Sequence, residues 1–325
     1  MKSSIALCTY NGERFIAEQL KSILSQTRLP DEIIVRDDCS TDNTVKIANS
    51  LLENSGIDYR IEVNKTNLGC GQNFLKCYDS CKGEVIFSCD QDDIWENTKV
   101  ETIMDLFENN SNVTLVFSNA ELIDSNGESL GITLLETIGV PKDFYIDREF
   151  YKNRLYGDTF GNFLVYGCCN AFRKEFYKML LPFPEGWYFD SYIAICAPIY
   201  GEIVYINESL IKYRQHEGNH SGSLVNRKES VSTNNKSFDE RFKNPYIYFE
   251  FYKSFFDRNK ELLSTEDKKR VKRSIDFYSS LNYCKSAGKI KAMITLTVQY
   301  LKGNYKLLRG GFKVLVCDTL YIVKR

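Results

Sequence analysis

Residues 84–93 have the sequence Glu-Val-Ile-Phe-Ser-Cys-Asp-Gln-Asp-Asp, an apolar run that passes directly into three carboxylates and an amide. A short apolar run of this kind is typical of a buried strand. In open α/β sheets, ligands bind beyond the carboxyl ends of the strands. We therefore interpret Asp90, Gln91, Asp92 and Asp93 as part of a metal or nucleotide site, although acids more commonly cap turns and helices.

The rest of the first 120 residues alternates strand patterns with helix patterns. Apolar strands are expected at residues 5–9, 32–35, 59–63, 84–88 and 113–117, with a helical pattern after each of the first four. This order predicts an α/β fold, with a Rossmann-like, mostly parallel sheet flanked by helices. We interpret residues 118–160 as long loops. We expect an α/β domain over residues 1–235 and a helical, basic region over residues 236–325.

Polar residues also follow the first two predicted strands, as Thr9-Tyr10-Asn11-Gly12 and Asp37-Asp38-Cys39-Ser40. If the strands are neighbours, five carboxylates converge at one edge, which is costly unless a cation neutralises them. Because the available ligands are oxygens, we expect Mn²⁺ or Mg²⁺. Such an ion commonly completes its shell with phosphate oxygens, so we expect a nucleoside diphosphate as its companion.

Two other ligand classes fit the sequence poorly. A dinucleotide-binding enzyme needs a glycine-rich turn after the first strand, and this chain has only Gly12 there. Nucleic acid is not expected, because most of the chain is acidic and carries no binding motif. Eleven cysteines without an export signal indicate a reducing cytosol, where thiols such as Cys8, Cys89 and Cys196 act as core residues.

Five short motifs follow one another along the chain. They are Thr-Tyr-Asn-Gly-Glu-Arg-Phe at 9–15, Asp-Asp-Cys-Ser-Thr-Asp-Asn-Thr at 37–44, Asn67-Leu68-Gly69 with Asn73, Asp-Gln-Asp-Asp-Ile-Trp at 90–95, and Tyr-Arg-Gln-His at 213–216. Together they resemble the family 2 inverting glycosyltransferases of the GT-A fold. The last two motifs are most similar to bacterial rhamnosyltransferases of O-antigen and capsule assembly. The resemblance covers roughly residues 3–225.

The resemblance implies a role for each matching residue. Contacts to the donor nucleotide are implied for Thr9, Tyr10, Asn11, Asp37, Asp38, Asn73, Asp90, Gln91 and Arg214. The divalent metal would be held by Asp92, Asp90 and His216. The position of the catalytic base is matched by Asp190, and the acceptor side by Asp93, Trp95 and Trp187. The chain departs from the family at Phe189, where many relatives have His, and at Cys39, which replaces a usual Gly.

Several of these residues have a structural alternative. Asp190 could cap a helix that starts at Ser191. His216 lies in a loop rich in Gly and Asn, where an idle exposed histidine is ordinary. Trp95 and Trp187 could be packing residues.

The function that the resemblance implies is metal-dependent, inverting glycosyl transfer. The expected reaction moves L-rhamnose from a dTDP donor onto a lipid-linked glycan in the synthesis of a surface polysaccharide. One base and one stabilised leaving group are enough for such a displacement, so inversion is expected. The alternatives are a family 2 transferase with a UDP-hexose donor and a non-catalytic subunit that binds nucleotide sugars.

The 325-residue chain has a formal net charge of −1, but its charge is unevenly distributed. Residues 285–325 contain nine Lys or Arg and one acid, a net charge of +8, so the rest of the chain carries −9. Basic residues interleaved with Leu, Ile and Phe favour an anionic membrane surface as partner. We expect a cytoplasmic protein, peripheral on the inner face of the cell membrane, and self-association is possible. The alternative is a packed helical appendage with a solvated basic face.

Overall fold

The computed structural model describes residues 1–138, 140, 164–184, 189–219, 245–307 and 311–324. The chain forms two compact units: the second holds the C-terminal helices, and the first holds nearly all the other described residues. The boundary that we predicted, between residues 235 and 236, lies outside the described residues.

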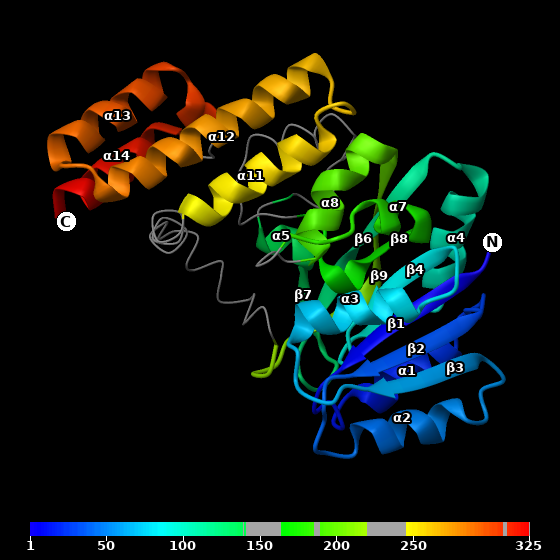
Figure 1. Ribbon diagram of the computed structural model, residues 1–325. Coiled ribbons are helices and arrows are strands. Elements are labelled where there is room, and N and C mark those ends of the chain that lie inside the picture. The colour runs from blue at the N-terminus through cyan, green and yellow to red at the C-terminus, as the bar shows by residue number, and fades with distance from the viewer. Residues whose placement is uncertain (139, 141–163, 185–188, 220–244, 308–310, 325) are drawn as a thin grey trace. The chain divides into compact units, whose positions relative to one another are not determined.

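The first unit is built on a nine-stranded sheet (Figure 1). Its strands are β1 (Ser3–Thr9), β2 (Glu32–Asp37), β3 (Asp58–Val63), β4 (Val85–Cys89), β5 (Ile94–Trp95), β6 (Val113–Ile123), β7 (Ser129–Thr133), β8 (Asn170–Arg173) and β9 (Glu202–Arg214). Eight of them follow the order β3-β2-β1-β4-β8-β6-β9-β5, and β7 pairs with the outer part of β6. The helices of this unit are α1 (Ile16–Leu24), α2 (Thr44–Leu52), α3 (Cys70–Ser80), α4 (Lys99–Asn109), α5 (Leu134–Thr137), α7 (Lys174–Met179) and α8 (Phe189–Tyr200).

The sheet is mixed but mostly parallel, as we predicted. Strands β3, β2, β1 and β4 run parallel to one another, and β6 and β9 run in the same direction on the far side of the antiparallel β8. The prediction of loops over residues 118–160 was wrong in part, because β6 continues to Ile123 and is followed by β7 and α5. Residues 141–160 of the predicted loop segment lie outside the described residues.

Successive side chains of β1 point to opposite faces of the sheet, and helices cover both faces. Ile5 and Leu7 belong to a buried cluster with Leu20 of α1 and Ala48 of α2. This follows from the two-residue period of a strand, which sends successive side chains to opposite faces. On the other face, the Cys77 thiol of α3 donates to a carbonyl of β2. Helices therefore cover both faces and leave the strand ends open to ligands.

Buried thiols behave as the sequence predicted. Cys8, Cys89 and Cys196 are all buried and none forms a disulfide. Burial raises the pKa of Cys8 to about 11, so this thiol stays protonated and packs as a small apolar group.

The second unit is helical, as we predicted for the chain beyond Asn244. Its helices are α11 (Pro245–Asn259), α12 (Thr265–Ser286), α13 (Lys289–Leu301) and α14 (Gly311–Lys324), with a short 3₁₀ turn at Asn304–Leu307. Stacked aromatic rings join α11 to α12, with Tyr248 and Tyr252 both packed on Tyr278. Among the described residues, no helix is both long enough and apolar enough to span a bilayer.

Candidate functional site

The polar clusters that we predicted at three strand ends lie at one edge of the sheet. Thr9 at the end of β1 pairs in register with Asp37 at the end of β2, and Leu7 pairs with Cys89 at the end of β4. Strand β9 runs in the same direction and ends at Arg214. Parallel strands therefore bring residues about 200 positions apart in the sequence to the same edge.

Thr9 and Asp37 shape the loop after β2. The Asp37 carboxylate is fully buried and accepts hydrogen bonds from Thr9 Oγ1 at 2.7 Å, Ser40 Oγ at 2.6 Å and Ser40 N at 2.8 Å. The turn that these bonds enclose contains Cys39 at φ 71°, in the left-handed region that glycine favours. This explains why a glycine is usual at that position. Thr9 and Asp37 thus support the loop, and a direct contact from them to a donor stays a prediction.

Asp38 ties the same loop to the start of α3. Its oxygens accept hydrogen bonds from Leu68 N, Gly69 N and Asn64 Nδ2, each at 2.8 Å. The Asn64 side chain also donates to Asn73 Oδ1 at 2.8 Å, and Asn73 is almost fully buried. Asn73 therefore supports the loop. Asp38 is only 3% exposed, and the contact to a nucleotide base that we predicted for it stays a prediction.

Gln91 links the β1 loop to the β4 loop. Its amide accepts from Tyr10 N at 2.8 Å and donates to Tyr10 O at 3.0 Å. A side chain in place of Gly12 would collide with Gln91, since a Cβ there would lie 2.1 Å from Gln91 Oε1. Asn11 anchors the other side of the loop, because its amide oxygen accepts from Thr41 N at 2.9 Å. The Tyr10 ring is 49% exposed and is the open aromatic surface of this loop.

An acidic cluster lies where the loops meet. Burial raises the pKa of Asp90 to about 7, and the negative charges of Asp92 and Asp190 add to this increase. Burial also raises the pKa of Asp190, against the opposing effect of a hydrogen bond from Ser191 N. Asp190 comes from the start of α8, so the structure brings the predicted base within electrostatic reach of the predicted metal ligand Asp90.

His216 completes this cluster from the end of β9. Its Nε2 lies 2.8 Å from Asp92 Oδ2. Its Nδ1 accepts from Gly218 N at 3.1 Å, and its ring packs on Phe15 with 4.7 Å between centroids. Because Nδ1 accepts a hydrogen bond, a neutral His216 ring carries its proton on Nε2 and donates it to Asp92 Oδ2. A cation shared by His216 and Asp92 would take the place of this proton, and the ring would then donate from Nδ1 instead.

We predicted that Arg214 contacts the donor nucleotide, but its side chain is buried and bonded to other parts of the protein. The side chain is 1% exposed, and its guanidinium bonds Asp92 O at 2.8 Å and Glu18 Oε2 at 2.5 Å. It also lies over the ring of Phe15, and its backbone N donates to Asp93 Oδ1. These bonds fix the loop that carries the acids. The structure therefore favours a positioning role for Arg214 over contact with a diphosphate.

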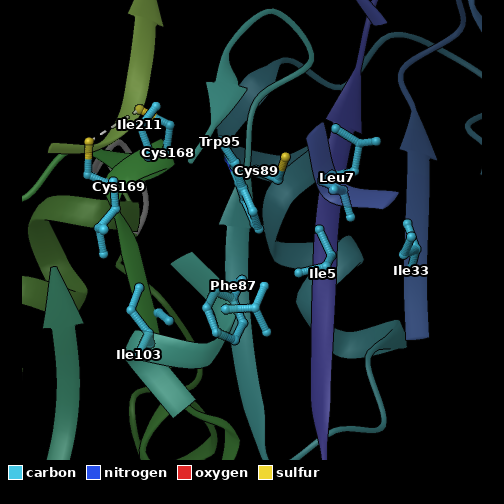
Figure 2. Close-up of a cluster of buried hydrophobic side chains, with 14 of the residues drawn as sticks. Ile5, Leu7, Ile33, Phe87, Cys89, Trp95, Ile103, Cys168, Cys169 and Ile211 are labelled. Atoms are coloured by element: carbon cyan, nitrogen blue, oxygen red, sulfur yellow. Dashed lines mark hydrogen bonds between the residues drawn. The ribbon is translucent and has the colours of Figure 1, made fainter. Parts of the chain in front are cut away.

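Asp93 and Trp95 are buried, which argues against the acceptor-side contacts that we predicted for them. Asp93 is 1% exposed, and burial raises its pKa well above the usual range. Trp95 is 3% exposed and points into the same core cluster as Phe87 and Cys89 (Figure 2). A ring packed in the core offers no face to a sugar. Trp187 lies outside the described residues.

Lys99 is a site residue that sequence reasoning missed. It is fully buried, its Nζ donates to Cys168 O at 3.0 Å, and the same ammonium lies 3.7 Å from the ring centroid of Trp95. Its charge lowers the pKa of Asp90 and so favours the carboxylate form. At the start of a helix a lysine is ordinarily solvated, so no sequence signal marks this one as a buried cation behind the acids.

The described residues offer two candidate sets of metal ligands. Asp90, Asp93 and Cys168 have ligand atoms within 4.8 Å of one another, but the Cys168 thiol is buried and its pKa is raised well above the usual range. A protonated sulfur suits Mn²⁺ or Mg²⁺ poorly. Asp92 and His216, with Asp90 beside them, present oxygen and imidazole ligands at the open strand ends, which suit these ions better.

Comparison with known proteins identifies the class of this site. Residues 4–181 match the model of glycosyl transferase family 2, so the chain belongs to this family. An uncharacterized glycosyltransferase of Nostoc sp. is 27% identical over 229 residues, which are 69% of this chain and 68% of that protein. An uncharacterized glycosyltransferase of Haemophilus influenzae is 29% identical over 234 residues, or 70% of this chain and 69% of that protein.

Two more comparisons concern a relative with a named donor and a solved structure. A dTDP-rhamnosyl transferase, RfbG of Shigella flexneri, is 40% identical over 125 residues, which are 37% of this chain and 40% of that protein. The crystal structure of S. aureus TarS 1–349 in complex with UDP-GlcNAc matches with a TM-score of 0.62 and 16% identity, over 99% of this chain and 90% of that one. The protein is therefore a glycosyltransferase of family 2 with the GT-A fold that we predicted.

The raised pKa of Asp90 predicts a pH-dependent stability of the metal-free protein. The folded state holds this proton up to about pH 7, whereas an unfolded chain releases it near the ordinary value of 3.8. The stability that the protonated form contributes is present at low pH and is lost as the pH rises through 7. Asp90→Asn should therefore gain thermal stability relative to the wild type between pH 5 and pH 8, measured in EDTA by thermal shift.

The control for this effect is Asp58→Asn, which changes an exposed acid at the far edge of the sheet. Its melting temperature should follow the wild-type curve at every pH. Parallel curves for wild type and Asp90→Asn would contradict the assigned pKa.

Proposed function

We propose that this protein is a metal-dependent inverting glycosyltransferase that moves a sugar from a nucleoside-diphosphate donor to a hydroxyl of a glycan. The observation that carries the proposal is the 2.8 Å contact between Asp92 Oδ2 and His216 Nε2, close to Asp90, whose pKa is raised by burial and by the charges of Asp92 and Asp190. Side chains from the loops after β4 and β9 and from the start of α8 thus lie near one another at the open edge of the sheet.

The residues present fit a divalent cation. Asp92 and His216 would hold it, and Asp90 beside them adds a carboxyl group whose pKa is raised by burial and by the neighbouring charges of Asp92 and Asp190. When bound, such an ion stabilises the negative charge of the departing diphosphate. Arg214 and Lys99 hold the surrounding loops through carbonyl hydrogen bonds, so the ligands are already in place before the donor arrives.

Asp190 is suited to the role of base. Its Oδ1 is held by Ser191 N at 2.6 Å and by Ser191 Oγ at 3.2 Å, which fixes the carboxyl group at the start of α8. Burial raises its pKa and therefore strengthens it as a proton acceptor. The acceptor hydroxyl gives its proton to Asp190, and its oxygen bonds the anomeric carbon as the bond to the diphosphate breaks on the opposite face. One such displacement inverts the anomeric configuration.

For the donor we propose dTDP-L-rhamnose. The 40% identity to the Shigella flexneri dTDP-rhamnosyl transferase supports this choice over 125 residues. A UDP-hexose is the second candidate, favoured by the shared fold with TarS, whose crystal structure contains UDP-GlcNAc. A non-catalytic subunit that binds nucleotide sugars is the third possibility. For the acceptor we propose a lipid-linked glycan at the cytoplasmic face of the cell membrane, in the synthesis of a surface polysaccharide.

A thermal-shift screen distinguishes the donors, because a ligand that binds the folded state raises its melting temperature. With Mn²⁺ present, dTDP-rhamnose should raise the melting temperature more than UDP-GlcNAc or UDP-glucose at equal concentration. A larger shift with a UDP sugar would replace the proposed donor. Binding without release of nucleotide diphosphate in the presence of acceptor lipid extract would favour the non-catalytic alternative.

Asp92→Asn should abolish transfer, because it removes the ligand that is in contact with His216. We expect a loss of about a hundredfold or more, since metal stabilisation of a leaving group amounts to several kcal/mol. The stabilisation of the protein by Mn²⁺ should be lost as well, whereas Asp58→Asn should retain both properties. Full wild-type activity in EDTA would contradict a metal-dependent reaction.

Asp190→Asn should remove turnover and leave donor binding nearly intact. Proton transfer by a positioned base contributes about 10²–10⁴-fold, so the turnover number should fall in that range. Calorimetry with the donor should give a dissociation constant close to that of the wild type. If donor affinity collapses together with turnover, Asp190 belongs to the donor site or to the folding of α8.

A further inference from the structure

Helix α13 turns its apolar side outward. Its exposed apolar residues are Ile290, Met293, Ile294, Val298 and Leu301, at spacings of three, one, four and three. In a helix of 3.6 residues per turn these positions form one stripe. Ile290 and Leu301, at its two ends, are 76% and 77% exposed. The opposite side, with Ala292, Leu296 and Gln299, is the buried one, so the helix has more large apolar side chains in solvent than in its core.

Helix α14 carries a second exposed stripe. Val316, Leu320 and Val323 are each more than 40% exposed, at spacings of four and three. The two helices lie side by side in the second unit (Figure 1), and Lys289 Nζ at the start of α13 donates to Val323 O near the end of α14 at 3.0 Å. We call the eight exposed apolar residues of the two stripes the α13–α14 face.

Exposed lysines flank this face. Lys289 and Lys291 are exposed on α13 beside the stripe, and Lys302 follows it. Lys302 pairs with Asp276 of α12, which is outside the basic segment. Asp318, the one acid of residues 285–325, is fully buried and accepts from Tyr305 Oη at 2.7 Å. Residues 285–325 therefore contribute no carboxylate side chain to the surface around this face.

Building on the proposed function, we propose that the α13–α14 face docks into the interface of an anionic lipid membrane. In such a membrane, the acyl chains can bury Ile290, Ile294 and Leu301, and the anionic headgroups attract the lysines. A second copy of the chain fits less well, because two such segments each carry a net charge of +8 and repel. The docked helices would hold the enzyme at the surface where its lipid-linked acceptor lies.

Vesicle flotation of the full chain tests this directly, without donor or acceptor. The protein should float with phosphatidylcholine vesicles that contain about 30% phosphatidylglycerol and should stay in the bottom fraction with phosphatidylcholine alone. Because salt screens the charges, raising NaCl from about 0.1 M to about 0.5 M should reduce the bound fraction several-fold. Protein that stays at the bottom at low salt, or floats equally on neutral vesicles, overturns the proposal.

Two variants assign binding to this face. Ile294→Glu with Leu301→Glu should abolish flotation, and Lys291→Glu should weaken it. The control is Leu29→Glu, which places a glutamate at a half-exposed leucine of the first unit and should float like the wild type. Thermal shift with the nucleotide sugar checks the fold of each variant. If the double variant floats unchanged, or if it only converts a dimer to a monomer in sedimentation, the face is not a membrane surface.

These measurements separate the inference from the proposed function. If the protein floats but no nucleotide sugar raises its melting temperature, the membrane-docking proposal stands and the proposed donor site is wrong. If the protein transfers sugar but does not float, the proposed reaction stands and the membrane-docking proposal is wrong.

Discussion

The buried guanidinium of Arg214 is the interaction on which the rest of the site depends. It bonds the Asp92 carbonyl and the Glu18 carboxylate and lies over the Phe15 ring, so it joins β9, the loop after β4 and the region of α1 in one place. A buried charge of this kind is stable only when all its partners are in position. His216, two residues along the chain, is thereby brought to Asp92, and the predicted metal ligands form a single group.

Repulsion among carboxylates sets the electrostatic character of the site. Burial raises the pKa of Asp90 most, and the charges of Asp92 and Asp190 raise it further. The protein opposes this repulsion with the Lys99 ammonium, which is held by Cys168 O and by the face of Trp95. Trp95 therefore contributes from the core, as a support for a buried cation. Such a group of carboxylates is suited to binding a divalent cation, which could in turn bind the diphosphate of a donor.

The loops around the donor side are held by hydrogen bonds between polar residues rather than left open to the ligand. Of the residues that matched the family motifs, Thr9, Asp37 and Asn73 have their polar groups bonded to the protein and buried. Their types are dictated by the shape of the loops, such as the left-handed turn at Cys39. Asp38 is buried and bonded in the same way, whereas Tyr10 is 49% exposed. A motif thus mixes residues that bind with residues that keep the binding loop in shape.

The sequence by itself determined the alternation of strands and helices, the parallel sheet and the position of the acids after β4, because these depend on local hydrophobic period and on polar residues next in the chain. It also indicated a helical, basic C-terminal region. Tertiary structure alone decided which polar residues are buried: Lys99 and Arg214 resemble solvated residues in the sequence, and Trp95 resembles a binding-site aromatic. Burial depends on packing between segments about 100 positions apart, and no local pattern records it. The same reason applies to α13, whose periodicity gives an apolar stripe but not the side that faces solvent.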